Sequence, residues 1–182
     1  MTFEDANLEA AVRDYLEGAG QQADFTCRGV VGVTTIVANQ RRISSIVGIQ
    51  NFTSLEHFEV SSNSISDISS LSGLTSLTVL YLDRSSITDI SALSGLTNLG
   101  RLRLNGNSIT DISALSGLIR LGEDPLGGLF LDDNPNLSNI QPLLDNIGLG
   151  AGDLVSLGGT SVSCTDVAAL EAKGVTVVSD CP

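Results

Sequence analysis

Hydrophobic positions recur every 22 residues along the middle of this chain. The string SITDISALSGL occurs at 86–96 and again at 108–118, and a near copy, SISDISSLSGL, occupies 64–74. A fixed period of this length indicates one supersecondary unit that stacks on copies of itself. The chain is therefore predicted to form a solenoid, in which an extended surface rather than a deep pocket is the working part.

Within each unit, apolar residues hold fixed positions that read LxxLxLxxN, and three clean copies begin at Leu55, Leu77 and Leu99. This spacing is the signature of the shorter leucine-rich repeats, and its register over three copies makes chance similarity a poor explanation. Weaker copies lie on both sides, and the fifth unit follows an insertion around GEDPL at 122–126. We expect about six stacked units, with the most regular ones in the middle.

The alternation of side chains places a strand in each unit. In LYLDRSS at 80–86, the two leucines point inward while Tyr81 and Asp83 point outward. The strands are expected to stack about 4.8 Å apart in a curved parallel sheet. Apolar residues at every third position of the return segment fit short 3₁₀ turns better than α-helices. The predicted fold is an α/β leucine-rich repeat solenoid with the sheet on its concave face and short 3₁₀ or irregular segments on its convex side.

The last position of the repeat pattern, usually asparagine, lies where the chain leaves the sheet. An asparagine side chain can bond the backbone groups of that bend. Ser85 and Thr160 occupy this position in two units and are expected to supply part of those bonds, whereas Arg41 is not.

Both ends of the solenoid are predicted to be capped, because exposed sheet edges pair with other chains. Residues 5–17 place apolar side chains on one helical stripe, with Asp5 available as the N-cap. Near the other end, a short helix over 167–172 precedes a closing strand, VTVV, at 175–178. We expect one continuous domain with an N-terminal helical cap (1–30), about six repeats (31–163) and a C-terminal cap (164–182).

The chain resembles the internalin-type leucine-rich repeat proteins that bacteria secrete or display on their surface. Besides the repeats, NLEAAVR at 7–13 resembles the entry cap of that group, and DNIGLGAGD at 145–153 and ALEAKGVTV at 169–177 resemble its exit segment. The resemblance implies the solenoid fold and a secreted or cell-surface location. It names no ligand, since members share the scaffold and differ at the exposed strand positions.

Charge and composition narrow the choice of partners. The chain has 21 acidic and nine basic residues and a net charge of −12, which argues against nucleic acid and anionic membranes. No apolar run is long enough to span a bilayer, so membrane insertion is not expected. The chain begins at Met1 without a secretion signal. An extracellular location therefore implies that a signal has been removed, and otherwise the compartment prediction is wrong. We expect a monomer.

The three cysteines bear on the compartment. Cys164 and Cys181 bracket the C-terminal cap, where a helix followed by a returning strand brings them close enough for a disulfide worth about 3 kcal/mol. The alternative is a pair of reduced core cysteines. Cys27 precedes the first repeat, roughly 24 Å away at the spacing of parallel strands, so it is not expected to pair with either, and its redox state stays open.

Residue types that carry chemistry are scarce. The only histidine is His57, and neither a nucleophile elbow nor a cysteine and histidine cluster with zinc spacing occurs. We therefore predict no enzyme, no cofactor and no metal site. The adjacent carboxylates of Asp132 and Asp133 are the one feature that leaves a hydrolytic activity open.

Two polar ladders recur on the return segments. One contains Asp67, Asp89 and Asp111. A row of calcium sites is one reading, but calcium takes six or more oxygens and each turn offers one acid, so capping of the following helical turn is preferred. The other ladder contains Thr53, Thr75 and Thr97. Such hydroxyls could bind ice or a glycan, but stacked threonines are usually solvated turn residues.

The outward positions of the strands are the stronger candidate for a binding surface. Arginine and tyrosine dominate protein interfaces, and two arginines here lie on one strand between aromatic neighbours. The predicted partner-binding residues are His57, Glu59, Tyr81, Asp83, Arg101, Arg103, Phe130 and Asp132. The competing interpretation is charge pairing across neighbouring strands, in which the two aspartates neutralise the two arginines.

Two functions follow from these features. The first is a protein-recognition module that binds its partner through the concave sheet. The second is a structural or adhesion solenoid that spaces other parts of a surface and recognises glycan or ice.

Overall fold

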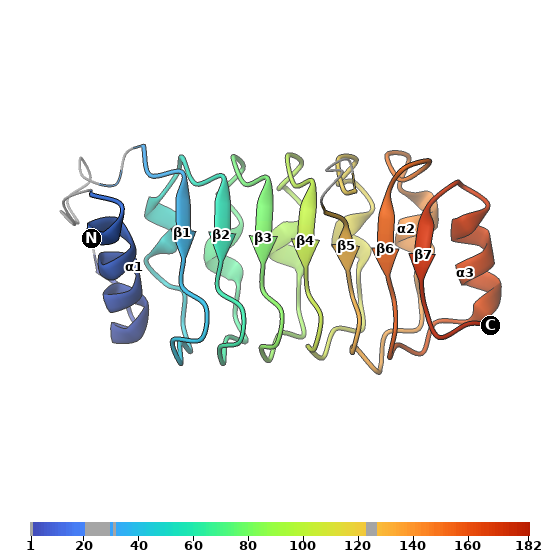
Figure 1. The fold of residues 1–182 in the computed structure, drawn as a ribbon, viewed down its shortest axis with the longest axis horizontal. Coiled ribbons are helices and arrows are strands. Elements are labelled where there is room, and N and C mark those ends of the chain that lie inside the picture. Colours follow the sequence, from blue (N-terminus) through green and yellow to red (C-terminus); the bar gives the residue numbers. More distant parts are fainter. Residues whose placement is uncertain (1, 21–29, 31, 123–126) are drawn as a thin grey trace.

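Figure 1 shows the computed structural model, which describes residues 2–20, 30, 32–122 and 127–182. Seven short strands in the described part of the chain form one open parallel sheet, in the order in which they occur along the sequence. The strands are β1 (Thr35–Val37), β2 (His57–Glu59), β3 (Val79–Tyr81), β4 (Arg101–Arg103), β5 (Leu129–Phe130), β6 (Leu154–Ser156) and β7 (Thr176–Val178). The predicted leucine-rich repeat solenoid is confirmed.

One inner column of aliphatic and aromatic side chains holds the sheet to the rest of the solenoid. Leu80 pairs with Leu102 across β3 and β4, and Leu102 pairs with Leu129 across β4 and β5. The fully buried members of the column are Ile36, Phe58, Leu80, Leu102, Leu129 and Val155. Each repeat contributes one thin layer, so the column is buried only when neighbouring repeats are stacked on both sides.

The return segments lie behind the sheet in Figure 1 and are mostly 3₁₀ turns, as the three-residue spacing predicted. The turns span Ile49–Asn51, Ser69–Leu71, Ser91–Leu93 and Ser113–Leu115. The fifth return segment differs from the prediction, because α2 (Gln141–Asp145) is a short α-helix. Its first turn contains Pro142, whose fixed φ suits the start of an α-helix and whose missing amide is not needed there.

The aspartate ladder caps the three middle turns. At each of Asp67, Asp89 and Asp111, the carboxylate accepts a hydrogen bond of 2.8 Å from the amide two residues later. That bond, from Ser69 or Ser91, lowers the pKa of Asp67 and of Asp89 below the ordinary value for aspartate. The aspartates thus bond the first amide of each turn, as the capping interpretation expected, but the turns begin one residue later than predicted, with Ile68, Ile90 and Ile112 as their N-cap residues. In the described ranges, no group of three or more His, Cys, Asp or Glu side chains is arranged to hold a metal ion.

Helix α1 (Ala6–Gly18) covers the edge of β1 (Figure 1) and agrees with the helix predicted over residues 5–17. Asp5 is its N-cap, because Oδ1 accepts from the amides of Asn7 at 2.8 Å and Leu8 at 3.2 Å. Oδ2 accepts from the amide of Ser44 at 2.7 Å and from its hydroxyl at 2.9 Å. One carboxylate thus fastens the capping helix to the first repeat.

Replacing Asp5 with alanine is expected to lower the free energy of unfolding by about 2 kcal/mol at pH 7, because the helix cap and the bonds to Ser44 are lost together.

The size of this loss should depend on pH. Burial acts to raise the pKa of the Asp5 carboxyl, but the hydrogen bonds from Ser44, Leu8 and Asn7 outweigh it and hold the pKa below the ordinary value. A lowered pKa in the folded state stabilises the protein above the unfolded pKa, near 4. That stabilisation is lost as the pH falls through the pKa that Asp5 has in the folded protein. Urea unfolding at several pH values measures the difference in the free energy of unfolding between wild type and variant. This difference should be constant above about pH 5 and should shrink below about pH 4. A difference that stays constant down to pH 2 would contradict this assignment.

Asparagines at the end of the repeat pattern tie consecutive turns together. Asn107, for example, accepts from the amide of Ile87 at 3.0 Å and donates to the carbonyls of Leu82 at 3.1 Å and Leu104 at 2.9 Å. Asn63 makes the equivalent bonds one turn earlier. These bonds satisfy backbone groups that the bend leaves without a ladder partner.

The two hydroxyl residues at this position behave differently. Thr160 replaces one of the asparagine bonds by donating to the carbonyl of Leu157 at 2.7 Å. The buried hydroxyl of Ser85 has no hydrogen-bond partner in the described part of the chain, so the prediction of partial replacement is wrong there. The serine side chain is too short to span two turns of the backbone.

Ser85→Asn is expected to stabilise the protein by about 1 kcal/mol, because the longer side chain reaches the amide of Ile65 and the carbonyls of Val60 and Leu82. Thermal unfolding of this variant measures the gain. Ser86→Asn, at an exposed position next to it, is the matched control and should leave the melting temperature unchanged. Equal melting temperatures for all three proteins would show that the turn at Ser85 cannot accept the asparagine geometry.

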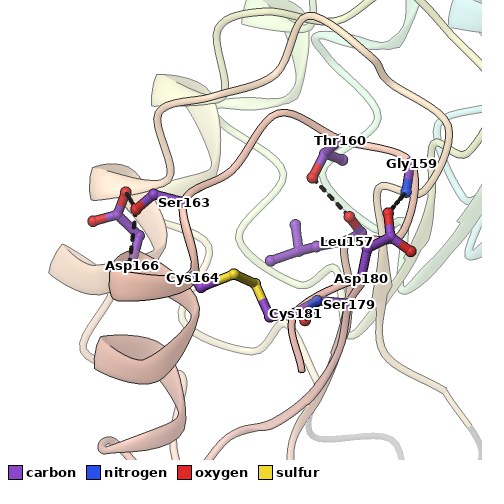
Figure 2. The surroundings of a disulfide bond; sticks show 9 residues. All are labelled: Leu157, Gly159, Thr160, Ser163, Cys164, Asp166, Ser179, Asp180 and Cys181. Atoms are coloured by element: carbon purple, nitrogen blue, oxygen red, sulfur yellow. Dashed lines mark hydrogen bonds between the residues drawn. A yellow bond between two sulfur atoms is a disulfide. The ribbon is translucent and has the colours of Figure 1, made fainter.

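The C-terminal cap consists of α3 (Cys164–Glu171) and β7, and a disulfide joins the first residue of α3 to Cys181, which follows β7 (Figure 2). The Cα atoms of Cys164 and Cys181 are 5.5 Å apart, which confirms the predicted pair. Helix α3 begins three residues before the predicted start because the hydroxyl of Ser163 accepts from the amide of Asp166 at 3.1 Å. The prediction for Cys27 lies outside the described residues.

Candidate functional site

The strand side chains that point away from the core form two rows across the sheet, which we call the sheet face. The predicted residues occupy these rows as expected. His57 and Glu59 lie on β2, Tyr81 on β3, Arg101 and Arg103 on β4 and Phe130 on β5, while Asp83 and Asp132 each lie one residue beyond the residue that follows β3 or β5. All eight side chains are half-buried rather than fully exposed, because they pack against one another.

The centre of the sheet face is an arginine held between two aromatic rings. Strand register places Arg103 opposite Tyr81 on one side and Phe130 on the other. Its guanidinium carbon lies 4.4 Å from the centre of the Tyr81 ring and 5.2 Å from the centre of the Phe130 ring. Both distances are within the range of cation–π attraction. The conformation of this arginine is therefore fixed by its neighbours.

Two further side chains extend this stack across the sheet. Arg101 donates from a terminal nitrogen to the hydroxyl of Tyr81 at 2.9 Å, which fixes the position of the tyrosine. The His57 ring meets the Tyr81 ring edge on, with the ring centres 5.9 Å apart, and its Nε2 lies 2.8 Å from a carboxylate oxygen of Glu59. Four neighbouring strands thus contribute to one preorganised cluster.

The carboxylates near Arg103 are committed elsewhere. Asp83 accepts from the hydroxyl of Ser61 at 2.7 Å. Asp132 accepts from the amide group of Asn105 at 3.0 Å and also from the hydroxyl of Ser156. Ion pairs between described residues join Arg13 to Glu9, Arg41 to Asp14 and His57 to Glu59. Arg103 is in none of these pairs, so neither Asp83 nor Asp132 forms the direct ion pair with it that the competing interpretation requires.

A hollow of about 290 Å³ opens beside Arg103, where β3, β4 and β5 end. It is lined by Asp83, Arg84, Arg103, Asn105, Gly106, Phe130 and Asp133. Arg84 and Asp133 were not among the predicted site residues, because each follows an outward strand position by one residue. The backbone takes a left-handed conformation at both, with φ of 55° and 54°. That bend brings their side chains to the hollow, and residue type alone gives no signal for it.

The adjacent carboxylates do not form a catalytic pair. Both oxygens of Asp132 accept hydrogen bonds, from Asn105 on one side and from Gly158 and Ser156 on the other. Asp133 is exposed, and its backbone turns away from the strand direction. The geometry gives no support to a hydrolytic activity at these two aspartates.

The comparisons with known proteins agree with the repeat pattern. The family described as leucine-rich repeats in two copies matches residues 53–95 and 75–117. No curated protein shows significant sequence similarity to the chain. None of the helices in the described ranges is long and apolar enough to cross a membrane.

Solved structures are similar over most of the chain. An internalin, InlF, from Listeria monocytogenes str. 4b F2365 is 36% identical with a TM-score of 0.77, and the match covers 92% of this chain and 47% of InlF. The chain therefore spans about half the length of that protein. The functional domain of InlJ from Listeria monocytogenes, described as including a cysteine ladder, is 20% identical with a TM-score of 0.63. That match covers 88% of this chain and 38% of InlJ, and it supports the fold alone.

Proposed function

Because the chain is an internalin-type leucine-rich repeat protein, we propose that it is a non-catalytic recognition module whose sheet face binds a protein partner. Proteins with this fold act as protein-interaction modules. The finer proposal is that the cluster of Tyr81, Arg101, Arg103 and Phe130 anchors the partner. The observation that carries it is the position of Arg103, which is held between two rings and forms no ion pair with a described carboxylate.

The energetics of binding favour this cluster over the rest of the surface. Arginine and tyrosine contribute most when they are already fixed in the free protein, because less side-chain entropy is lost on association. The hollow beside the cluster offers a place where a partner side chain can be removed from water. Elsewhere the chain is strongly acidic, with a net charge of −12, so a pair of arginines at the centre of the sheet face is a local exception.

The disulfide of the C-terminal cap supports a secreted or cell-surface location, because such bonds persist in oxidising compartments. We propose that location together with the recognition role.

Screening the chain against a displayed library of extracellular protein domains, followed by titration of the purified partner, tests the proposal. Arg103→Glu is expected to weaken binding by about 100-fold, since it removes the central anchor and reverses its charge. Arg13→Glu, the same charge reversal on α1, is the matched control and should bind within about twofold of wild type. Both variants should keep the melting temperature of wild type to within a few degrees.

The outcome also separates the two functions proposed for the fold. If Arg103→Glu binds as tightly as wild type, the sheet face is not the recognition surface. A spacer or adhesion role, including recognition of glycan or ice by the threonine ladder, would then be the better account.

A further inference from the structure

We propose that the hollow beside Arg103 receives a carboxylate from an aspartate or glutamate side chain of the protein partner. This inference rests on the proposed recognition role and adds the chemistry of the central contact.

The first support is that Arg103 presents an unused set of donors. In the described part of the chain it forms no hydrogen bond and no ion pair, and its Nε is buried without a partner. The rings of Tyr81 and Phe130 satisfy the faces of the guanidinium but none of its N–H groups. A planar group whose orientation is already fixed and whose terminal donors are open matches the two oxygens of a carboxylate.

The second support is a second guanidinium at the same hollow. Arg84 lines it from the bend that follows β3, and it too is absent from the ion pairs between described residues. Gly106 lies directly beside it, and a Cβ at that position would come within 3.4 Å of Arg84 Cγ. A carboxylate in the hollow would therefore approach two positive charges, from neighbouring turns of the solenoid.

The acidic residues at the hollow decide which anion it accepts. Asp83 is held by the Ser61 hydroxyl on the side of β2, and Asp133 lines the opposite wall from the bend after β5. Two arginines and two aspartates leave no excess of positive charge, so a dianion such as phosphate is disfavoured. A single negative charge is favoured where it contacts the Arg84 and Arg103 guanidinium groups directly, on the side of the hollow away from Asp83, whose oxygen accepts from the Ser61 hydroxyl. Nearby Asp132 is likewise occupied by Asn105.

Two substitutions at the hollow should change its affinity for a carboxylate in opposite directions. Arg103→Lys keeps the charge and removes the planar fork, so it should weaken carboxylate binding by about fivefold to tenfold. Asp133→Asn removes a like charge and should strengthen binding by about twofold. A purely structural role of these residues predicts no gain from Asp133→Asn.

The test uses two neutralised amino acids as probes, N-acetyl-glutamate N-methylamide and N-acetyl-glutamine N-methylamide, which differ in one charged group. NMR spectra of the arginine Nε–H groups are recorded on the full chain during titration with each probe, with the Arg103 signal assigned from Arg103→Lys. The glutamate probe should shift the Arg103 and Arg84 signals saturably at millimolar concentration, and the glutamine probe should not. Inorganic phosphate should produce a weaker shift than the glutamate probe at equal ionic strength.

Equal shifts with the two probes would overturn the inference, as would a shift at Arg103 no larger than that at Arg13 on α1. If Arg103→Lys does not fold, Arg84→Gln at an exposed position serves in its place and should weaken binding by about threefold. Failure here is distinguishable from failure of the recognition role. If Arg103→Glu abolishes binding of the purified partner but the probes do not discriminate, the sheet face is the site and its central contact is not a carboxylate.

Discussion

Asn134→Ala is expected to lower the free energy of unfolding by about 4 kcal/mol. The Asn134 side chain is fully buried, and its oxygen accepts from the amide of Ile109 at 3.0 Å. Its nitrogen donates to the carbonyls of Leu104 at 3.0 Å and Leu131 at 2.8 Å. Alanine would leave the amide of Ile109 and the carbonyl of Leu131 buried without partners, at about 1–3 kcal/mol each before any relaxation, while the carbonyl of Leu104 keeps its bond from Asn107. Urea unfolding followed by circular dichroism measures the loss.

Asn98→Ala provides the matched control, because the exposed Asn98 side chain donates to one carbonyl, that of Thr75, at 2.8 Å. Its expected cost is about 0.5 kcal/mol or less, since water replaces the lost bond. Similar costs for the two variants would mean that water enters the bend at Asn134 and that the asparagine column is not a structural requirement.

Removal of the disulfide by the double substitution of Cys164 and Cys181 to serine is expected to destabilise the protein by about 3 kcal/mol. The bond closes a loop with a sequence separation of 17 residues and so restricts the unfolded chain. It also fastens the start of α3 to Cys181 in the segment that follows β7, the last strand of the sheet (Figure 2). Amide hydrogen exchange in β7 should accelerate more than exchange in β3, because opening of the cap exposes the edge of the sheet first.

Wild type with a reducing agent serves as the control and should unfold at the same urea concentration as the double variant. If reduced and oxidised wild type unfold together, the cap is held by packing of Val167 and Leu170 rather than by the covalent bond. A loss of stability with uniform exchange along the sheet would mean that the solenoid unfolds as one unit and that the cap does not open by itself.

Periodicity was sufficient to predict the backbone of this fold and the orientation of most side chains. The 22-residue spacing placed Leu80, Leu102 and Leu129 in one column despite the insertion before the last of them, and strand alternation placed Tyr81 and Arg103 on the opposite face. Both follow from backbone geometry, which repeats whenever apolar positions keep their spacing. Helix α2 departs from the pattern because Pro142 changes the local backbone preference.

Which groups bond to one another on the sheet face could not be predicted in this way. Charge alone suggests that Asp132 neutralises Arg103, but Asn105 and Ser156 reach that carboxylate and the arginine stacks on rings instead. The outcome depends on competition between side chains of similar reach on neighbouring strands. The hollow depends in addition on a left-handed residue after each strand, which in Arg84 and Asp133 is not glycine and is not marked by residue type.

The most direct test of the account is photo-crosslinking from two positions on the same repeat to the partner identified by the library screen. Benzoylphenylalanine replaces Val79 on the sheet face in one variant and Ala92 in the 3₁₀ turn behind the sheet in the other. The account predicts one crosslinked product of defined mass from position 79, its loss when Arg103→Glu is added, and no product from position 92. Crosslinking from position 92 that persists with Arg103→Glu would contradict recognition through the sheet face.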